Sequence, residues 1–388
     1  GGQVKVAQSL GAGDAPLAGR FAQNSLQLGL ILSALYALVM LLFHQPLIGF
    51  FKLNDPAVVR DAETYLVIVS AGMVFSVLTL VFTGLITATG NSKTPFLATV
   101  LGLLLNIVLD PLLIFGIGPI PPMGVGGAAL ATVLAQALVV LLFVLYARKD
   151  SHLFCHVRMR RKPDRACMKE ILRIGLPSAM QSMLFTEVSM VIARLIAAWG
   201  DAAVAVQKVG SQIESISWMT ADGFAAAVNS FVGQNYGAKN YQRARKGYWM
   251  SVGTISVWGI LSSLLLIFCA APIFRIFIPD ASVTPLGVDY LVILGVSQMP
   301  MCVDIITAGA FAGYGRTLSP SVATTLLVVS RIPLSMVLSA TALGLNGIWW
   351  SISITSILRG IVLFLMMVLF FKRMDRSQAE KSAQRTAV

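Results

Sequence analysis

Charged residues are scarce in this sequence. They make up 12% of the 388 residues, whereas hydrophobic residues make up 56% and the mean hydropathy is +0.80. Soluble domains carry about 25% charged residues, so this chain lacks the polar surface that a soluble enzyme of its length needs. The composition also excludes a disordered chain and a collagen-like repeat, and it indicates a helical membrane protein with several spans.

Cysteines and catalytic motifs are scarce as well. The 4 cysteines, at positions 155, 167, 269 and 302, show no CxxC spacing, so neither a disulfide framework nor a zinc ribbon is predicted. No P-loop, GxSxG or HExxH motif occurs. We therefore expect no enzymatic activity, no cofactor, and no metal beyond Na⁺ at acidic groups. The net charge of +12 arises in short loops rather than on an aromatic-laced basic face, so nucleic acid is not an expected partner.

Long apolar runs, in contrast, fill most of the chain. A transmembrane helix needs about 20 mainly apolar residues. Continuous runs of this length exclude a β-barrel, whose strands alternate over about 10 residues. The sequence predicts an all-α polytopic membrane protein with ten spans, at about 24–50, 62–89, 95–117, 124–147, 171–199, 203–232, 248–277, 286–313, 319–343 and 347–371.

Lysine and arginine are distributed unevenly between alternate loops. With the N-terminus placed in the cytoplasm, the opposite loops carry only Lys52, Arg60 and Arg275, and most of the other basic residues lie on the N-terminal side. Cytoplasmic loops hold the excess of these residues in membrane proteins. We therefore expect a multi-pass protein of the plasma membrane with both termini in the cytoplasm.

Three segments of the first half recur in the second half in the same order. AQSLGA (7–12) corresponds to GQNYGA (233–238), GLITATGNSKTP (84–95) to GAFAGYGRTLSP (309–320), and MGVGGAA (123–129) to LGLNGIW (343–349). The offsets are nearly constant, so the chain contains an internal repeat. An even number of spans in each complete half would relate the repeats by a pseudo-two-fold axis along the membrane normal.

The repeat also predicts the domain organisation. Two spans, 171–199 and 203–232, precede GQNYGA, whereas no span precedes AQSLGA. We therefore expect a parent architecture of six plus six helices, of which this chain lacks the first two; the alternative is a genuine ten-helix protein. The predicted parts are an incomplete N-lobe of four helices (1–147), a basic cytoplasmic linker (148–170), a C-lobe of six helices (171–371) and a cytoplasmic tail (372–388).

Seven segments resemble the multidrug and toxic compound extrusion (MATE) family of the MOP superfamily. They are AQSLGAGD (7–14), GNSKTP (90–95), NIVLDP (106–111), GVGGAALAT (124–132), FTEV (185–188), GQNYGAKN (233–240) and VDIITAGAFAGYGRT (303–317). Their order and spacing carry the resemblance. It implies a two-lobe antiporter that exports organic, often cationic, compounds in exchange for Na⁺ or H⁺. The family's first helix contributes an acidic residue to the N-lobe site, so that site is incomplete here.

Glu187 and Asp304 lie in the middle of apolar spans. A charge at the membrane centre is costly, and such residues face a bundle interior or a cavity. Met180 and Met183 share a helical face with Glu187, and Met301 shares one with Asp304, so both faces suit a cavity for varied ligands. The alternative is a carboxylate held by a neighbouring helix. The match to acidic family positions favours cation coupling and substrate binding, with the two carboxylates converging if their helices pack together.

The predicted span 203–232 carries a polar stripe along one helical face. Steps of three, four and seven residues connect its members, which are Gln207, Ser211, Glu214, Trp218, Asp222 and Asn229. Two interpretations stay open, a cavity wall and hydrogen bonding between helices. We assign Glu214 and Asp222 to the C-lobe cation or substrate site and Trp218 to the cavity lining.

A second candidate site lies in the first half. Asn106 and Asp110 share a helical face, and Pro111 removes a backbone donor and can free a carbonyl. The resemblance implies an N-lobe cation site at these residues, which Thr132 matches more loosely. The alternative is a polar cluster that packs helices together. Arg331 aligns with Asn106 across the repeat, so the second half builds its site differently.

The expected function is multidrug efflux by antiport and alternating access, performed by a monomer in the lipid bilayer on small organic substrates. One rival is a lipid-linked precursor flippase, which needs a cationic cavity. This chain places acids inside its spans, with few cations beyond Arg331 and Arg359, which argues against it. The other rival is an uncoupled membrane channel. Arg359 is expected either to pair with an acid or to extend toward the membrane surface.

Overall fold

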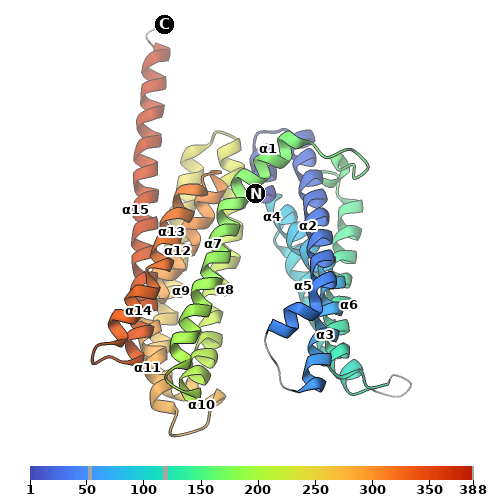
Figure 1. Cartoon of the computed structure of the whole chain (residues 1–388). Helices are drawn as coiled ribbons and strands as arrows, with labels where there is room; N and C mark the ends of the chain where they lie inside the picture. The colour runs from blue at the N-terminus through green and yellow to red at the C-terminus, as the bar shows by residue number, and fades with distance from the viewer. Residues whose placement is uncertain (51–54, 117–120, 387–388) are drawn as a thin grey trace. The chain divides into compact units, whose positions relative to one another are not determined.

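The computed structural model describes residues 1–50, 55–116 and 121–386, and in these residues the secondary structure is helical with no strand. The chain forms two compact units, residues 2–171 and residues 172–388. Figure 1 shows that each unit is a bundle of helices. The all-α polytopic fold predicted from the sequence is thereby confirmed.

The first unit contains six α-helices and one short 3₁₀ helix among the described residues, and α7 begins at its end. Its elements are α1 (Gly2–Gly11), α2 (Ala15–Phe50), α3 (Pro56–Ala71), α4 (Met73–Ala88), α5 (Lys93–Ile114), α6 (Gly124–Lys149) and η1 (Phe154–His156).

The second unit holds most of α7 and all later helices. These are α7 (Arg165–Ala197), α8 (Asp201–Gly237), α9 (Tyr241–Phe268), α10 (Ala270–Phe277), α11 (Thr284–Gly295), α12 (Gln298–Gly313), α13 (Leu318–Val329), α14 (Arg331–Ser339) and α15 (Leu345–Thr386). The α12 helix packs against α8, α9 and α15. It is therefore the element around which the polar groups of this unit are arranged.

Most of the ten predicted spans satisfy a length and hydropathy criterion. In the described residues, 7 helical segments are long and apolar enough to cross a membrane, and 9 qualify if each bent pair of helices counts as one span. The remaining predicted span, 203–232, lies in α8, whose 37 residues extend over about 55 Å at 1.5 Å per residue. That length exceeds the hydrocarbon thickness of about 30 Å, and the polar stripe explains why α8 fails a criterion based on hydropathy.

Backbone conformations repeat with the sequence. Gly90 and Gly315 follow the equivalent helices α4 and α12 with φ of 90° and 72°, and Gly124 and Gly344 both have φ of 53°. Positive φ is strained for residues with a side chain, so glycine is required at both copies. The internal repeat is therefore present in the local geometry of each unit as well as in its sequence.

The bent helix pairs also occupy equivalent positions. The α3–α4 pair bends by 45° next to Gly72, and the α11–α12 pair bends by 47° next to Ser297. Asp55 and Asp280 stand at equivalent positions before these pairs, and each accepts a hydrogen bond of 2.8 Å from the backbone amide two residues later. Each half of the repeat thus contains one broken span, and an aspartate that accepts a backbone hydrogen bond precedes it in both halves.

The basic linker packs on the first unit. Gln27 of α2 donates a hydrogen bond of 2.7 Å to the carbonyl of Arg161, and the backbone amide of Asp164 donates one of 2.7 Å to Asn24. Arg20 forms an ion pair with Asp164, and this guanidinium lowers the pKa of the Asp164 carboxyl. The predicted linker, residues 148–170, therefore belongs to the same compact unit as α1–α6.

Candidate functional site

Polar and charged side chains from five helices meet inside the second unit. Glu214 comes from α8, Tyr290 from α11, Asp304 from α12, Arg331 from α14 and Arg359 from α15. These residues lie in or beside long apolar stretches, where a helix must turn its few polar groups toward other helices. We call these five residues and the groups that bind them the interior cluster.

Asp304 and Arg359 form an ion pair within this cluster. Their side chains are 3% and 13% exposed, so the pair is largely removed from solvent. Among the described residues, Oδ1 of Asp304 and Nε of Arg359 have no hydrogen-bond partner. The pair therefore neutralises both charges but leaves one acceptor and one donor available.

Arg331 is the second buried cation. It is 6% exposed, and its Nε and Nη2 atoms donate hydrogen bonds to Thr355 (2.8 Å) and Ser356 (2.9 Å) on α15. Its guanidinium also lies 5.6 Å from the ring centre of Phe185 on α7, a favourable cation–π arrangement. Three neighbouring groups thus fix the guanidinium, and none of them is an acid.

Glu214 receives hydrogen bonds from neutral donors. Tyr290 donates its phenolic hydrogen at 3.0 Å, and the Gln298 amide donates at 3.3 Å. Behind them, Gln207 donates to the hydroxyl of Tyr290 at 3.5 Å and accepts a bond of 2.9 Å from the indole of Trp349. A chain of hydrogen bonds therefore extends from α15 through α8 and α11 to the carboxylate.

The interior cluster is balanced in charge. It contains two acids, Glu214 and Asp304, and two arginines, of which Arg331 binds α15 next to Arg359 on the same helix. Arg331 and Arg359, the few cations expected among the interior acids, thus equal the acids of the interior cluster in number. The argument against an anionic substrate that rested on the scarcity of interior cations is therefore lost.

Among the described residues no hydrogen bond or ion pair joins Glu187 to Asp304, so the expected convergence of these two carboxylates stays a prediction. Glu187 is exposed on α7, and among the described residues it has no hydrogen bond or ion pair, whereas the partner of Asp304 is Arg359. Asp222 is likewise exposed on α8. These two acids lie on the surface of the unit and do not belong to the interior cluster.

The predicted cavity-lining residues also lie at or near the surface of the second unit. Met180 and Met183 are exposed on α7, on the same helix as Glu187. Trp218 of α8 and Met301 of α12 are partly buried. The two methionines and Glu187 thus form an exposed strip along α7, as their helical spacing predicted.

In the first unit, Asn106 and Asp110 lie together on α5. The Asn106 amide donates to Asp110 at 3.4 Å, and both side chains are partly buried. Thr132 is exposed on α6 and donates its hydroxyl hydrogen to the carbonyl of Ala128, one turn earlier in the same helix. The structure thus joins the first two residues and gives the third a partner within its own helix.

Sequence reasoning missed several members of the interior cluster. Tyr290, Gln298, Thr355 and Ser356 bind its charged groups, but none was singled out. A usable signal was present, because Ser351, Ser353, Thr355 and Ser356 interrupt an apolar span and all four are buried. Small hydroxyl residues clustered in one span indicate a polar partner on a neighbouring helix.

A polytopic helical bundle with an internal repeat and charged groups buried among its helices is typical of a membrane transporter. The MatE family model matches residues 1–112 and 177–337. The chain is also 31% identical over 366 residues to a probable multidrug resistance protein NorM of Thermotoga maritima, with 90% of this chain and 75% of the relative covered. The chain belongs to the MatE family, and it is accordingly a multi-pass transporter rather than an enzyme.

Two further similarities extend over nearly the whole chain. A FAD transporter of Shewanella oneidensis is 28% identical over 372 residues, which cover 94% of this chain and 80% of the relative. A crystal structure of MATE in the bent conformation matches with a TM-score of 0.89 and 26% identity, covering 97% of this chain and 84% of that one. The fold therefore agrees with that of solved transporters of this family.

Proposed function

We propose that this transporter exports small organic compounds in exchange for protons, and that Glu214 is the group that binds the coupling proton. The observation that carries this proposal is the difference between the two acids of the interior cluster. Asp304 is already neutralised by Arg359, whereas the direct partners of Glu214 are the neutral donors Tyr290 and Gln298. Among the described residues, Glu214 is therefore the acid of the interior cluster that has no direct ion pair and is open to protonation.

A proton suits this carboxylate better than Na⁺ does. Hard metal cations need several oxygen ligands around them. The Tyr290 and Gln298 contacts present O–H and N–H hydrogens to the carboxylate instead of oxygen atoms. A proton needs only one carboxylate oxygen and a nearby acceptor. Gln298 contacts Glu214 through its amide nitrogen, and its buried Oε1 atom has no partner among the described residues.

Exchange follows from a difference in affinity between two states of the transporter. In the proposed cycle, proton binding from one side favours release of the cargo, and cargo binding from the other side favours release of the proton. Each ligand shifts the conformational equilibrium only as far as it binds the two states unequally. Glu187 and the exposed methionines of α7 supply a negative and adaptable surface for organic cations.

We also propose that the protein resides in the plasma membrane with both termini in the cytoplasm. In the second unit, the α8–α9 and α12–α13 connections and the exposed end of α15 carry Lys239, Arg316 and Arg373, among other basic residues. The connection between α10 and α11 follows Arg275 and contains Asp280. The positive-inside tendency supports this orientation.

The test is dye efflux from proteoliposomes that contain the full chain, with a pH gradient and a Na⁺ gradient imposed separately. The expected result is efflux of a fluorescent organic cation driven by the pH gradient. Glu214→Gln is expected to abolish the gradient-driven component. Asp201→Asn, on the exposed first residue of the same helix, is the matched control and is expected to keep it.

Two outcomes would contradict the proposal. Efflux driven by a Na⁺ gradient alone would show that Na⁺, and not the proton, is the coupling ion. Full coupling in Glu214→Gln would show that Glu214 does not bind the coupling proton. Thermal unfolding of each variant must match the wild type, so that loss of transport reports on coupling rather than on folding.

An anionic nucleotide is the second candidate cargo, and a specific observation favours it. Arg331 is buried and the Arg359 side chain is only 13% exposed within the second unit, and one relative is named as a FAD transporter. The same vesicles loaded with FAD distinguish the two cargo classes. Export of FAD without export of the dye would establish the nucleotide class.

A further inference from the structure

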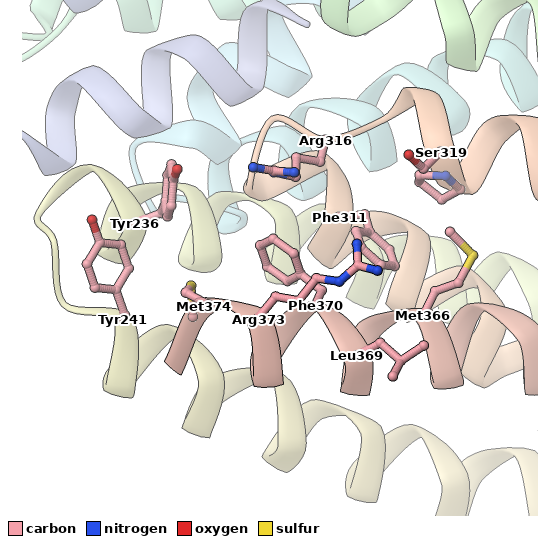
Figure 2. Close-up of a pocket in the computed structure, with 11 residues that line it drawn as sticks. Tyr236, Tyr241, Phe311, Arg316, Ser319, Met366, Leu369, Phe370, Arg373 and Met374 are labelled. Atoms are coloured by element: carbon pink, nitrogen blue, oxygen red, sulfur yellow. The ribbon is translucent and has the colours of Figure 1, made fainter. Parts of the chain in front are cut away.

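A cavity of about 700 Å³ lies at one end of the second unit, away from the interior cluster. The ends of α8 and α12, the beginnings of α9 and α13 and residues 366–374 of α15 supply its walls. Figure 2 shows the lining side chains. Its lining residues are Tyr236, Tyr241, Phe311, Arg316, Ser319, Pro320, Met366, Leu369, Phe370, Arg373 and Met374. The volume falls within the range of about 300–1,000 Å³ that is typical of small-molecule sites.

Two uncompensated cations line this cavity. Arg316 and Arg373 are exposed, and among the described residues neither guanidinium forms an ion pair. Asp375, the acid two residues after Arg373, is bound by Arg245 at 2.9 Å. The cavity therefore carries positive charge with no acid of its own, and it is complementary to an anion.

Aromatic rings form the rest of the cavity wall. The guanidinium of Arg316 lies 5.4 Å from the ring centre of Phe370, so that the charge is held above a ring face. The ring of Tyr314 packs against those of Tyr236 and Phe370 with centres 5.4 Å and 4.9 Å apart. These contacts hold Tyr236 and Phe370 in place beside the charged groups, and the wall suits a ligand that has an apolar part beside its charge.

An exposed apolar strip extends away from the cavity along α15. Leu369 lines the cavity, and Leu365, Ile361 and Leu358 follow it at steps of four, four and three residues. All four side chains are exposed, and this spacing keeps them on one face of the helix. In a membrane protein such a face contacts lipid chains, so the cavity is continuous with the lipid-facing surface.

We propose that this cavity binds the phosphate headgroup of an anionic membrane phospholipid, with Arg316 and Arg373 on the phosphate and an acyl chain along the α15 strip. Arginine suits this role because its guanidinium matches the geometry of phosphate oxygens. In the orientation proposed above, this basic end of the unit faces the cytoplasmic leaflet, where anionic lipids are enriched and attract such residues. The proposal is independent of the cargo and of the coupling ion.

The experiment is a titration of the full chain in neutral detergent with dioctanoyl phosphatidylglycerol, followed by native mass spectrometry. The expected result is one bound lipid with a clearly higher affinity than that of dioctanoyl phosphatidylcholine. A basic residue near the membrane surface contributes about 1 kcal/mol, or about fivefold in affinity. Arg316→Gln and Arg373→Gln should therefore each weaken binding about fivefold, and the double variant about 25-fold.

Two further variants separate the site from general charge. Arg376→Gln removes an exposed arginine from the same helix, one turn beyond Arg373 and outside the lining residues, and should leave the affinity unchanged. Ser319→Phe fills the cavity but keeps both arginines, and should weaken binding. A thermal unfolding midpoint equal to that of the wild type identifies each variant as folded.

Three results would overturn the proposal. Equal affinity for phosphatidylcholine would show that the anionic headgroup is not recognised. An equal loss in Arg376→Gln would reduce the effect to net charge. Binding of glycerol 3-phosphate as tight as that of phosphatidylglycerol would assign the cavity to a soluble phosphate compound and exclude the lipid.

Discussion

The ion pair between Asp304 and Arg359 makes a quantitative prediction about stability. Arg359→Gln removes the cation but keeps a polar, though shorter, side chain. Asp304, with a side chain only 3% exposed, then carries a buried charge with no direct partner. The interior cluster changes from a balanced set of two acids and two arginines to a set with one excess negative charge.

The expected loss is large because a broken buried pair leaves one charge uncompensated. Such losses are about 3–5 kcal/mol, and a domain of about 200 residues responds with a shift of about 2–4 °C per kcal/mol. Arg359→Gln is therefore expected to lower the unfolding midpoint by about 10 °C. Asp304→Asn leaves Arg359 unpaired and should cost a similar amount, whereas the double variant restores the charge balance and should recover most of the loss.

The assay is thermal unfolding of the purified full chain in detergent, followed by intrinsic tryptophan fluorescence. Arg194→Gln is the control, because Arg194 is exposed on α7 and has no ion pair among the described residues. Its midpoint should stay within about 2 °C of the wild type, as surface substitutions cost little. A double variant whose loss equals the sum of the two single losses would refute the pairing.

Two further predictions concern the linker and the repeat. The pKa of Asp164 is lowered in the folded protein. Its stabilising contribution is therefore complete above the pKa of the unfolded chain, about 4, and is lost as the pH falls through the folded pKa. Asp164→Asn should speed amide hydrogen exchange in residues 158–164 at pH 7, and the difference from the wild type should disappear at low pH. A Cβ on Gly347 would lie 2.5 Å from the carbonyl of Leu338, so Gly347→Ala should cost about 1–3 kcal/mol in a thermal unfolding assay. Gly223→Ala, where a Cβ meets nothing within 4 Å, should be neutral or stabilising.

Much of the helical fold could be predicted from hydropathy, because the apolar runs are as long as the membrane is thick. The starts of helices that extend beyond the apolar runs were harder to predict from the sequence. The α2 helix begins at Ala15, ahead of the predicted start at 24, because its first turns carry Arg20, Gln23 and Asn24, which bind the linker and not lipid. The bends next to Gly72 and Ser297 were also missed, since a break within an apolar run leaves its mean hydropathy unchanged.

The candidate site was predictable residue by residue but not as a set of contacts. Helical periodicity shows which residues share a face, but it does not show which helix lies opposite that face. Asp304 and Arg359 are 55 residues apart in the chain, and Glu214 and Tyr290 are 76 apart. These pairings arise from the packing of α12 against α15 and of α8 against α11, which the sequence pattern does not specify.

Charge balance in the interior cluster gives the proposed exchange a physical basis. With Glu214 and Asp304 matched by Arg331 and Arg359, the empty cluster is neutral overall. One added proton leaves a single excess positive charge, and a cationic cargo bound near the cluster at the same time would add a second. Like charges in a medium of low dielectric constant repel strongly, so the two ligands exclude each other even if they touch different residues. An antiporter requires competition of this kind. We therefore expect the double variant Asp304→Asn/Arg359→Gln, which keeps the charge balance of the cluster, to retain more exchange activity than either single variant.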